Sequence, residues 1–262
     1  MYPEQTMTKT IKIGFLFLSI FLLTIISIYA IKQTFSVFHE TTERKLPIYC
    51  VDTDQPKISI SFDAAWGNED TADILSILRK YNIKATFFMT GGWVDKYPDD
   101  VKAIAKAGHD LGNHSQNHKQ MSQLSTSECI EEIQSVNDKV KKLTGITPIL
   151  FRPPYGDYNN TVVESTKTCN CHCIQWDVDS LDWKNYSIDS IISTVANHKH
   201  LGNGSIILMH NGAKYTKDAL PTLIEELQKK GYTIVPISEL IYMNDYTIDT
   251  EGRQHQTNSP QQ

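Results

Sequence analysis

Two histidines four residues apart, His114 and His118, are the residues whose types and spacing most directly suggest chemistry. If the segment His114-Ser115-Gln116-Asn117-His118 forms a helical turn, both imidazoles lie on one side and can hold one divalent metal ion. Such an ion, with open coordination positions, lowers the pKa of a bound water and polarises a carbonyl group, and amide hydrolysis needs both effects. Because many histidine pairs at this spacing are only solvated turns, the pair needs support from its surroundings.

Hydrolysis of an amide also needs a base for the attacking water and an acid for the departing nitrogen. Asp63 is a candidate for the base and His210 for the acid. Each has a simpler interpretation: Asp63 could cap a helix, and His210 could be a hydrogen-bonded core histidine. Arg152 could likewise pair with any carboxylate. Their positions relative to the predicted strands decide between these interpretations.

Strand-like and helix-like segments alternate through the middle of the chain, which predicts an α/β fold. The expected strands are residues 57–62, 85–89, 110–113, 150–152, 172–176, 205–209 and 233–236. The expected helices are residues 71–81, 99–107, 126–143, 161–167, 188–197 and 217–230. Ser125 and Glu128 form a capping-box pattern, and Gly108 and Gly231 follow two of the helices. About seven such units favour an α/β barrel over an open sheet.

Ionisable residues end or follow five of these strands: Asp63, His114, Arg152, the pair Asp177 and Asp179, and His210. In α/β barrels the carboxyl ends of the strands meet at one face, where catalytic groups collect. We therefore expect these side chains to converge, which favours a hydrolytic site over scattered structural roles.

Five short motifs occur in a fixed order. They are Ser61-Phe62-Asp63, His114-Ser115-x-x-His118, Arg152-Pro153-Pro154-Tyr155-Gly156, Asp179-Ser180-Leu181-Asp182-Trp183 and Leu208-Met209-His210. In this order the chain resembles the polysaccharide deacetylase family (NodB-homology domain, carbohydrate esterase family 4) over residues 57–240.

The resemblance implies a deformed (β/α) barrel that removes N-acetyl groups from amino-sugar polymers, with peptidoglycan or a related cell-wall glycan as the expected substrate. It implies a divalent metal ion, zinc above all or else cobalt or another ion. By the resemblance, His114 and His118 bind the metal, Asp63 is the general base and Arg152 orients that base. The backbone N–H of Tyr155 stabilises the oxyanion, His210 is the general acid and Asp182 is the carboxylate partner of His210. Trp183 and Tyr155 form walls of the substrate groove.

The sequence departs from the family at Ala64, where relatives carry a second aspartate that binds the metal. Three outcomes are open: water fills the position, Asp63 becomes a ligand, or Glu69 or Asp70 reaches in. We expect a weakened but functional site because the other motifs are intact. Asn211 also replaces an acidic residue of many relatives.

Three functions remain open on these residues: an N-deacetylase, a catalytically weak or inactive glycan-binding protein, and an O-acetyl esterase. Ala64 supports the second, and an ester leaving group would depend less on His210. No H-E-x-x-H zinc-protease motif occurs. The net charge of −5 and the lack of a basic run argue against nucleic-acid binding.

The ends of the chain differ in character from its middle. Residues 13–31 are apolar and uncharged, and Lys9 and Lys12 precede them. This predicts a single transmembrane anchor with a short cytoplasmic segment, residues 1–12, and a catalytic domain outside the cell membrane; a cleaved signal peptide is the alternative. We expect a stalk over residues 32–56, a polar disordered tail over residues 241–262, and a monomer.

Overall fold

The computed structural model describes residues 18, 20–29, 31 and 44–257. The chain divides into two units, Met1–Arg44 and Lys45–Gln262. In the first unit, residues 18, 20–29 and 31 are helical. Within the described ranges, no helix has the length and apolar character that crossing a membrane requires. The segments expected at residues 1–12 and 13–31 lie wholly or partly outside these ranges.

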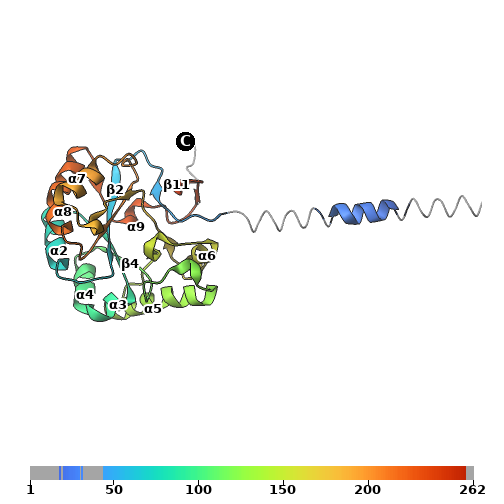
Figure 1. Cartoon of the computed structure of the whole chain (residues 1–262), viewed down its shortest axis with the longest axis horizontal. Coiled ribbons are helices and arrows are strands. Elements are labelled where there is room, and N and C mark those ends of the chain that lie inside the picture. The colour runs from blue at the N-terminus through green and yellow to red at the C-terminus, as the bar shows by residue number, and fades with distance from the viewer. Residues whose placement is uncertain (1–17, 19, 30, 32–43, 258–262) are drawn as a thin grey trace, which may run out of the picture. The chain divides into compact units, whose positions relative to one another are not determined.

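A parallel sheet forms the centre of the second unit and confirms the α/β class and its seven expected strands (Figure 1). Along the sheet the order is β6 (His172–Cys173), β5 (Leu150–Phe151), β4 (Asp110–Asn113), β3 (Thr86–Met89), β2 (Lys57–Ala64), β8 (Ile206–His210) and β7 (Val178–Asp179), and β9 (Thr233–Ile234) pairs with β2. All of these pairings are parallel. Because β6 and β7 are the two ends of this order, the barrel is an open, deformed one.

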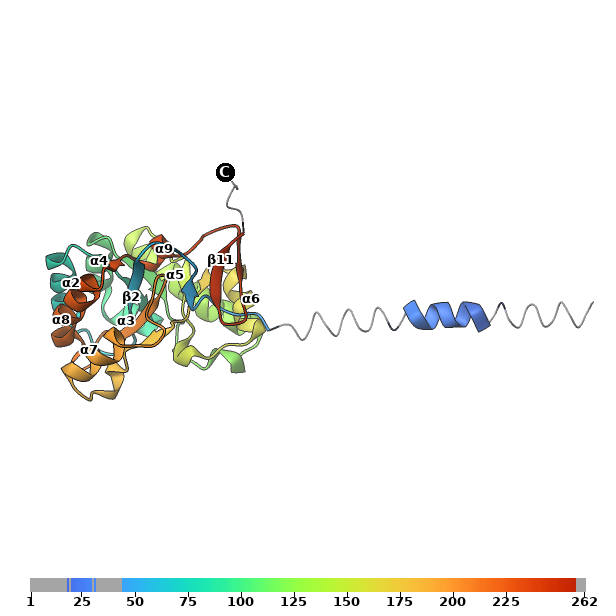
Figure 2. The same ribbon diagram turned by 90° about the horizontal axis from the view of Figure 1, so that it is seen from above.

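Helices lie around the outside of this sheet in both views (Figures 1 and 2). They are α2 (Thr71–Lys80), α3 (Gly91–Lys96), α4 (Pro98–Lys106), α5 (Thr126–Thr144), α6 (Asn160–Thr168), α7 (Ile188–Ala196), α8 (Thr216–Lys229) and α9 (Ile237–Leu240). The six expected helices are present, and Ser125 and Glu128 form the expected capping box. Gly108 and Gly231 have positive φ angles of 77° and 93°, as residues that follow a helix often do.

The two faces of β2 differ in chemistry, and this difference places the site. Ile58, Ile60, Phe62 and Ala64 alternate along one face and belong to the main apolar cluster. The other face carries Ser59, Ser61 and Asp63, which are also buried. The Ser61 hydroxyl donates to the Ile207 carbonyl at 2.8 Å, so the polar face is anchored to β8. Asp63 is therefore held inside the barrel at the carboxyl end of its strand.

A second, three-stranded sheet corrects two expectations. It joins β1 (Cys50–Val51), β11 (Arg253–Gln256) and β10 (Tyr246–Ile248). The stalk expected at residues 32–56 is therefore wrong for β1, and the disordered tail expected at residues 241–262 is wrong for β10 and β11. No periodic signal predicts these strands, because β1 and β10 have only two and three residues and β11 is wholly polar. They are held by backbone pairing and by the buried Gln254, whose side chain bonds the Tyr242 backbone at 2.6 and 2.9 Å.

The five cysteines are buried free thiols. Cys169, Cys171 and Cys173 pack with Cys129 in one apolar cluster. Burial raises the pKa of Cys173 to about 12, so this thiol stays protonated at neutral pH. These contacts favour a packing role for the three alternating cysteines over a metal-binding one.

Candidate active site

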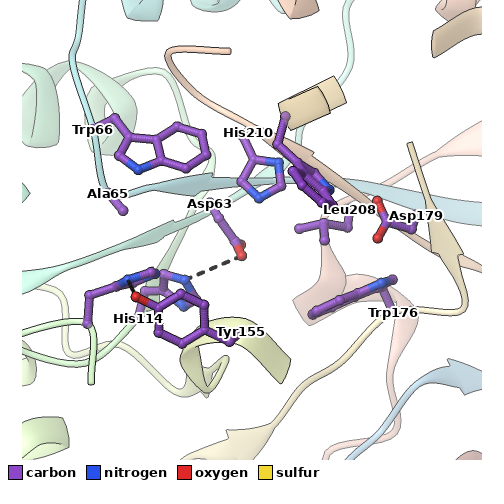
Figure 3. A pocket seen from close by; sticks show the side chains of 11 residues that line it. Asp63, Ala65, Trp66, His114, Tyr155, Trp176, Asp179, Leu208 and His210 are labelled. Atoms are coloured by element: carbon purple, nitrogen blue, oxygen red, sulfur yellow. Dashed lines mark hydrogen bonds and ion pairs between the residues drawn. The ribbon is translucent and has the colours of Figure 1, made fainter. Parts of the chain in front are cut away.

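The carboxyl ends of the strands enclose a cavity of about 430 Å³ (Figure 3). Its lining combines the expected chemical residues with aromatic ones: Asp63, Ala65, Trp66, His114, His118, Tyr155, Trp176, Asp179, Trp183, Leu208 and His210. Asp63 and His210 are direct partners in the register of β2 and β8, so they enter the cavity side by side. The expected convergence at one barrel end is thereby confirmed.

Asp63 is held in its ionised form by Arg152, which lies just after β5. The Arg152 Nη1 donates to Asp63 Oδ1 at 2.7 Å, and Nη2 donates to the Ser61 hydroxyl at 2.8 Å. The guanidinium is fully buried and stacks 4.1 Å from the centroid of the Phe88 ring. Burial alone would raise the pKa of Asp63, but the Arg152 charge, with smaller effects of His114 and His210, lowers it. A buried carboxylate with this partner stays ionised and can accept a proton.

His210 has the opposite electrostatic environment. Its Nδ1 donates to Asp182 Oδ1 at 2.7 Å, and its backbone N–H donates to Asp182 Oδ2 at 2.7 Å. Thr216 donates to the same Oδ2 at 2.6 Å and fixes that carboxylate. Burial would lower the pKa of His210, but Asp182, together with the charges of Asp63 and Asp179, raises it. The imidazole is thus favoured in its protonated form, with Nε2 left to donate.

The histidine pair lies together, but not on a helical turn. Ser115 and His118 have positive φ angles of 65° and 54°, so the expected helical turn is wrong. The loop is held instead by side chains, since Asn113 Oδ1 accepts from the Ser115 N–H at 2.9 Å and the Ser115 hydroxyl accepts from the His118 N–H at 3.0 Å. The ring centroids of His114 and His118 are still only 5.0 Å apart.

The geometry around His114 fits a cation. Its Nδ1 lies 2.7 Å from the Arg152 carbonyl, which accepts the proton of this nitrogen and leaves the Nε2 lone pair facing Asp63 Oδ2 at 3.4 Å. Burial lowers the pKa of His114, and it lowers the pKa of His118 to about 4, so both rings are neutral donors. Two ligands of one tetrahedral zinc lie roughly 3.3–3.6 Å apart, given bond lengths of about 2.0–2.2 Å. The 3.4 Å between His114 Nε2 and Asp63 Oδ2 lies in this range, so an ion bound by His114 would also lie against Asp63.

A third protein ligand for the metal ion is missing from this arrangement, in the part of the chain that the structure describes. Within the described ranges, no group of three or more His, Cys, Asp or Glu is placed to hold a metal. Ala64 is fully buried, belongs to the apolar cluster and does not line the cavity. Neither Asp70 nor Glu69 lines the cavity. The Asp70 carboxylate instead accepts the Gly212 N–H at 2.9 Å. The two imidazoles are thus the ligands, and Asp63 Oδ2, 3.4 Å from His114 Nε2, is the carboxylate oxygen that lies within reach of the same ion.

Tyr155 and Trp183 also lie where they were expected. Tyr155 has a positive φ of 61° between Pro154 and Gly156, and its hydroxyl lies 3.0 Å from His118 Nδ1. Tyr155 and Trp183 are 67% and 46% exposed, so both can contact a large substrate. Of the two extra carboxylates, Asp179 lines the cavity, whereas Asp177 turns to the Ser205 hydroxyl and the Ile206 N–H, at 2.9 and 2.8 Å.

Sequence reasoning missed two aromatic residues of the lining, Trp66 and Trp176. Trp66 stacks on the His210 ring with centroids 5.2 Å apart and an interplanar angle of 21° (Figure 3). Trp176 lies 5.5 Å from the Arg152 guanidinium carbon. Trp66 follows Asp63 by three residues and Trp176 precedes Asp177, so an aromatic residue beside a strand end was the available signal.

The chain is similar to a family model and to several known proteins. A family model described as polysaccharide deacetylase matches residues 51–174. The protein YlxY of Bacillus subtilis, described as uncharacterized, is 35% identical over 195 residues, which are 74% of this chain and 60% of YlxY. The chain thus spans less than two thirds of that relative.

Two further relatives are covered more fully. A peptidoglycan-N-acetylglucosamine deacetylase of Bacillus cereus is 35% identical over 196 residues, 73% of this chain and 91% of the relative. The peptidoglycan-N-acetylmuramic acid deacetylase PdaA of Bacillus subtilis is 32% identical over 208 residues, 76% of this chain and 77% of the relative.

One similar solved structure combines sequence identity with the same fold. It is a CE4 family pseudoenzyme from Bacillus anthracis, with a TM-score of 0.72 and 33% identity, covering 80% of this chain and 72% of that one. A mutant of that pseudoenzyme is described as having restored enzymatic activity. The motifs, the open barrel and these relatives agree, and the chain belongs to the polysaccharide deacetylase family.

Proposed function

We propose that this chain is a metal-dependent hydrolase that removes N-acetyl groups from an amino-sugar polymer, with peptidoglycan or a related cell-wall glycan as its substrate. The observation that carries the proposal is the pair Asp63 and His210, neighbours across β2 and β8 with opposite pKa shifts. Neighbouring groups whose environments push their pKa values apart are suited to act as base and acid.

Each group has a defined part in the proposed reaction. Asp63, kept ionised by Arg152, takes a proton from the attacking water. His210, held at Nδ1 by Asp182, gives a proton from Nε2 to the departing amine nitrogen. The backbone N–H of Tyr155 donates to the oxyanion that forms on the acetyl carbon.

His114 and His118 hold the metal in this proposal, zinc being the ion that suits neutral imidazoles best. When bound, the ion would acidify water and polarise the acetyl carbonyl. With two protein ligands in place of three, we expect weaker binding than in a site with a third carboxylate.

Acetate release by the full chain tests the proposal. The protein is incubated with N-acetylated glycans and, in parallel, with zinc, cobalt or a chelator. We expect acetate release that the chelator abolishes and that Asp63→Asn and His210→Gln each reduce about 10²–10⁴-fold. No acetate under any ion, from a protein that folds normally, would overturn it.

Catalytically inactive glycan binding is the second candidate, because Ala64 packs in the apolar cluster and a similar structure is described as a pseudoenzyme. Glycan binding that His114→Ala leaves unchanged, without bound metal, would favour this function over hydrolysis.

We also propose that the apolar segment 13–31 anchors the chain in the cell membrane, with the domain outside the cytoplasm. The uncharged sequence of this segment and the preceding Lys9 and Lys12 support it. Fractionation of full-length chain against a chain lacking residues 1–31 tests it, since only the former should stay with the membranes.

A further inference from the structure

Glu132 is a buried carboxylate that the proposed reaction does not use. It lies on α5 and is 4% exposed. Burying a charge is costly unless the charge is paired and hydrogen-bonded, so the partners of Glu132 indicate what it does. These partners lie in the loop that joins His114 to His118 and in the residue that follows this loop.

The Glu132 carboxylate binds the residues on both sides of His118. Its Oε2 accepts the backbone N–H of Asn117 at 2.8 Å, and its Oε1 accepts the Asn117 side-chain N–H at 2.7 Å. The same Oε1 lies 3.0 Å from the Lys119 ammonium. Burial raises the pKa of Glu132, but these hydrogen bonds outweigh burial and lower the pKa, so the carboxylate is ionised at neutral pH.

The backbone of Glu132 holds the same loop. Its carbonyl accepts the Gln116 N–H at 2.9 Å. Ser115 and His118 have positive φ angles, a conformation that residues other than glycine keep where their surroundings hold it in place. Glu132 therefore supplies, from outside the loop, part of the restraint that this conformation needs.

The path of the loop decides where the second imidazole lies. His114 is fixed independently, because it follows β4 directly and its Nδ1 lies 2.7 Å from the Arg152 carbonyl. His118 lies beyond three loop residues, yet its ring centroid is 5.0 Å from that of His114. Glu132 and Asn117 do not line the active-site cavity, so any effect of theirs on a ligand there passes through the loop.

We infer that Glu132 is a positioning residue for the histidine pair: by binding Asn117 and Lys119, it keeps the His118 imidazole beside His114. The inference deepens the proposed function, on which it rests for the metal-binding role of the pair. It predicts that metal affinity depends on a carboxylate that lies outside the cavity and is not itself a ligand.

Zinc affinity of the full chain, measured by competition with a chromogenic chelator, tests the inference. We expect Glu132→Ala to weaken zinc binding about 10-fold, as loss of a group that orients metal ligands does. Glu132→Gln keeps an acceptor for the Asn117 N–H but loses the charge, so it should weaken binding less. Glu131→Ala is the matched control, because it removes the same charge from an exposed position of the same helix. Wild-type affinity in Glu132→Ala would overturn the inference.

A destabilised variant separates positioning from support of the fold. Val136 is fully buried in the main apolar cluster, on the same helix as Glu132. Val136→Ala should lower the stability of the metal-free chain in urea unfolding and keep the zinc affinity, because it leaves the contacts of the loop in place. If Val136→Ala and Glu132→Ala lose zinc affinity in proportion to their loss of stability, Glu132 serves the fold alone and the inference is overturned.

Nuclear magnetic resonance of the histidine rings, in the presence of a chelator, tests the inference without metal. The His118 ring lies edge-on to Tyr155 with centroids 4.6 Å apart, so the Tyr155 ring current affects its proton signals. Glu132→Ala should move the His118 signals, assigned by their absence in His118→Gln, and leave those of His210 in place. Unmoved His118 signals would overturn the inference, whether or not the wild type releases acetate. Moved signals in a chain that releases no acetate would contradict only the proposed function.

Discussion

At the residue scale, the site depends on two carboxylates with different partners. Asp63 is paired with a guanidinium and Asp182 with an imidazole, at 2.7 Å in both cases. The first pair keeps a base deprotonated, and the second keeps an acid protonated. Because both carboxylates are buried, each pair is little screened by solvent, and the protonation states are set by these contacts.

These opposite shifts predict the pH dependence of activity. The lowered pKa of Asp63 keeps the base ionised down to acidic pH, and the raised pKa of His210 keeps the acid protonated above the ordinary value of 6.5. We expect kcat/KM to fall on the alkaline side as His210 loses its proton. Asp182→Asn removes the charge that raises this pKa, so the alkaline limb should move to lower pH. An unmoved limb would show that another group sets it.

Ala64 is the residue where metal affinity can be tested. We expect Ala64→Asp to tighten zinc binding by supplying a third ligand, measured by calorimetry. Because Ala64 is fully buried in the apolar cluster and outside the cavity lining, the new carboxylate has to turn from that cluster into the cavity, and the same change should cost about 1–3 kcal/mol of stability in urea unfolding. Ala65→Asp is the control, since Ala65 already lines the cavity and should cost less. Unchanged zinc affinity in Ala64→Asp would mean that another protein group already completes the site.

At the element scale, caps and strand ends fix the framework around the site. Ser125 begins α5 with a capping box, and its hydroxyl accepts from the Glu128 N–H. We expect Ser125→Ala to lower stability by about 1 kcal/mol, which a denaturant titration measures. Ser135→Ala, in the middle of the same helix, is the matched control and should not lower stability. An equal loss in both variants would count against the capping role.

The sequence predicted the elements that carry strong periodic signals and missed the weak ones. The alternation along β2 and the capped helix α5 were found to within one or two residues at each end. The two-residue strand β7 has no room for alternation, and the six-residue α3 has no room for a helical stripe. The His114 loop was mistaken for a helical turn because side-chain bonds from Asn113 and Ser115, and not its spacing, set its path.

The site itself was more predictable than the elements, because parallel strands bring their carboxyl ends to one place. Asp63, His114, Arg152 and His210 needed only the strand order to converge. Trp66 was not predicted, since its contact with His210 depends on the path of the loop after β2. Position along a strand can be read from sequence, whereas the direction of a loop side chain requires the structure.

At the scale of the whole molecule, the two ends of the domain support each other across the sequence. Cys50 and Val51 of β1 pair with Arg253 and Gln254 of β11, and Val51 is fully buried. The Val51 N–H donates to the Gly204 carbonyl at 3.0 Å, just before β8. Since β8 carries His210 at its other end, the second sheet is connected to the strand that positions the acid.

Removing residues 246–262 therefore tests whether this sheet supports the fold. The truncation deletes β10 and β11, removes the pairing of β1 with β11 and uncovers apolar residues such as Val51 and Ile48. We expect a lower midpoint in thermal unfolding, and a larger fall in stability than in the control that lacks only residues 258–262, which keeps every described strand. Acetate release below the unfolding transition should persist in both, because all of the proposed catalytic residues remain. Equal midpoints for the two truncations would show that the C-terminal strands contribute nothing to the stability of the domain.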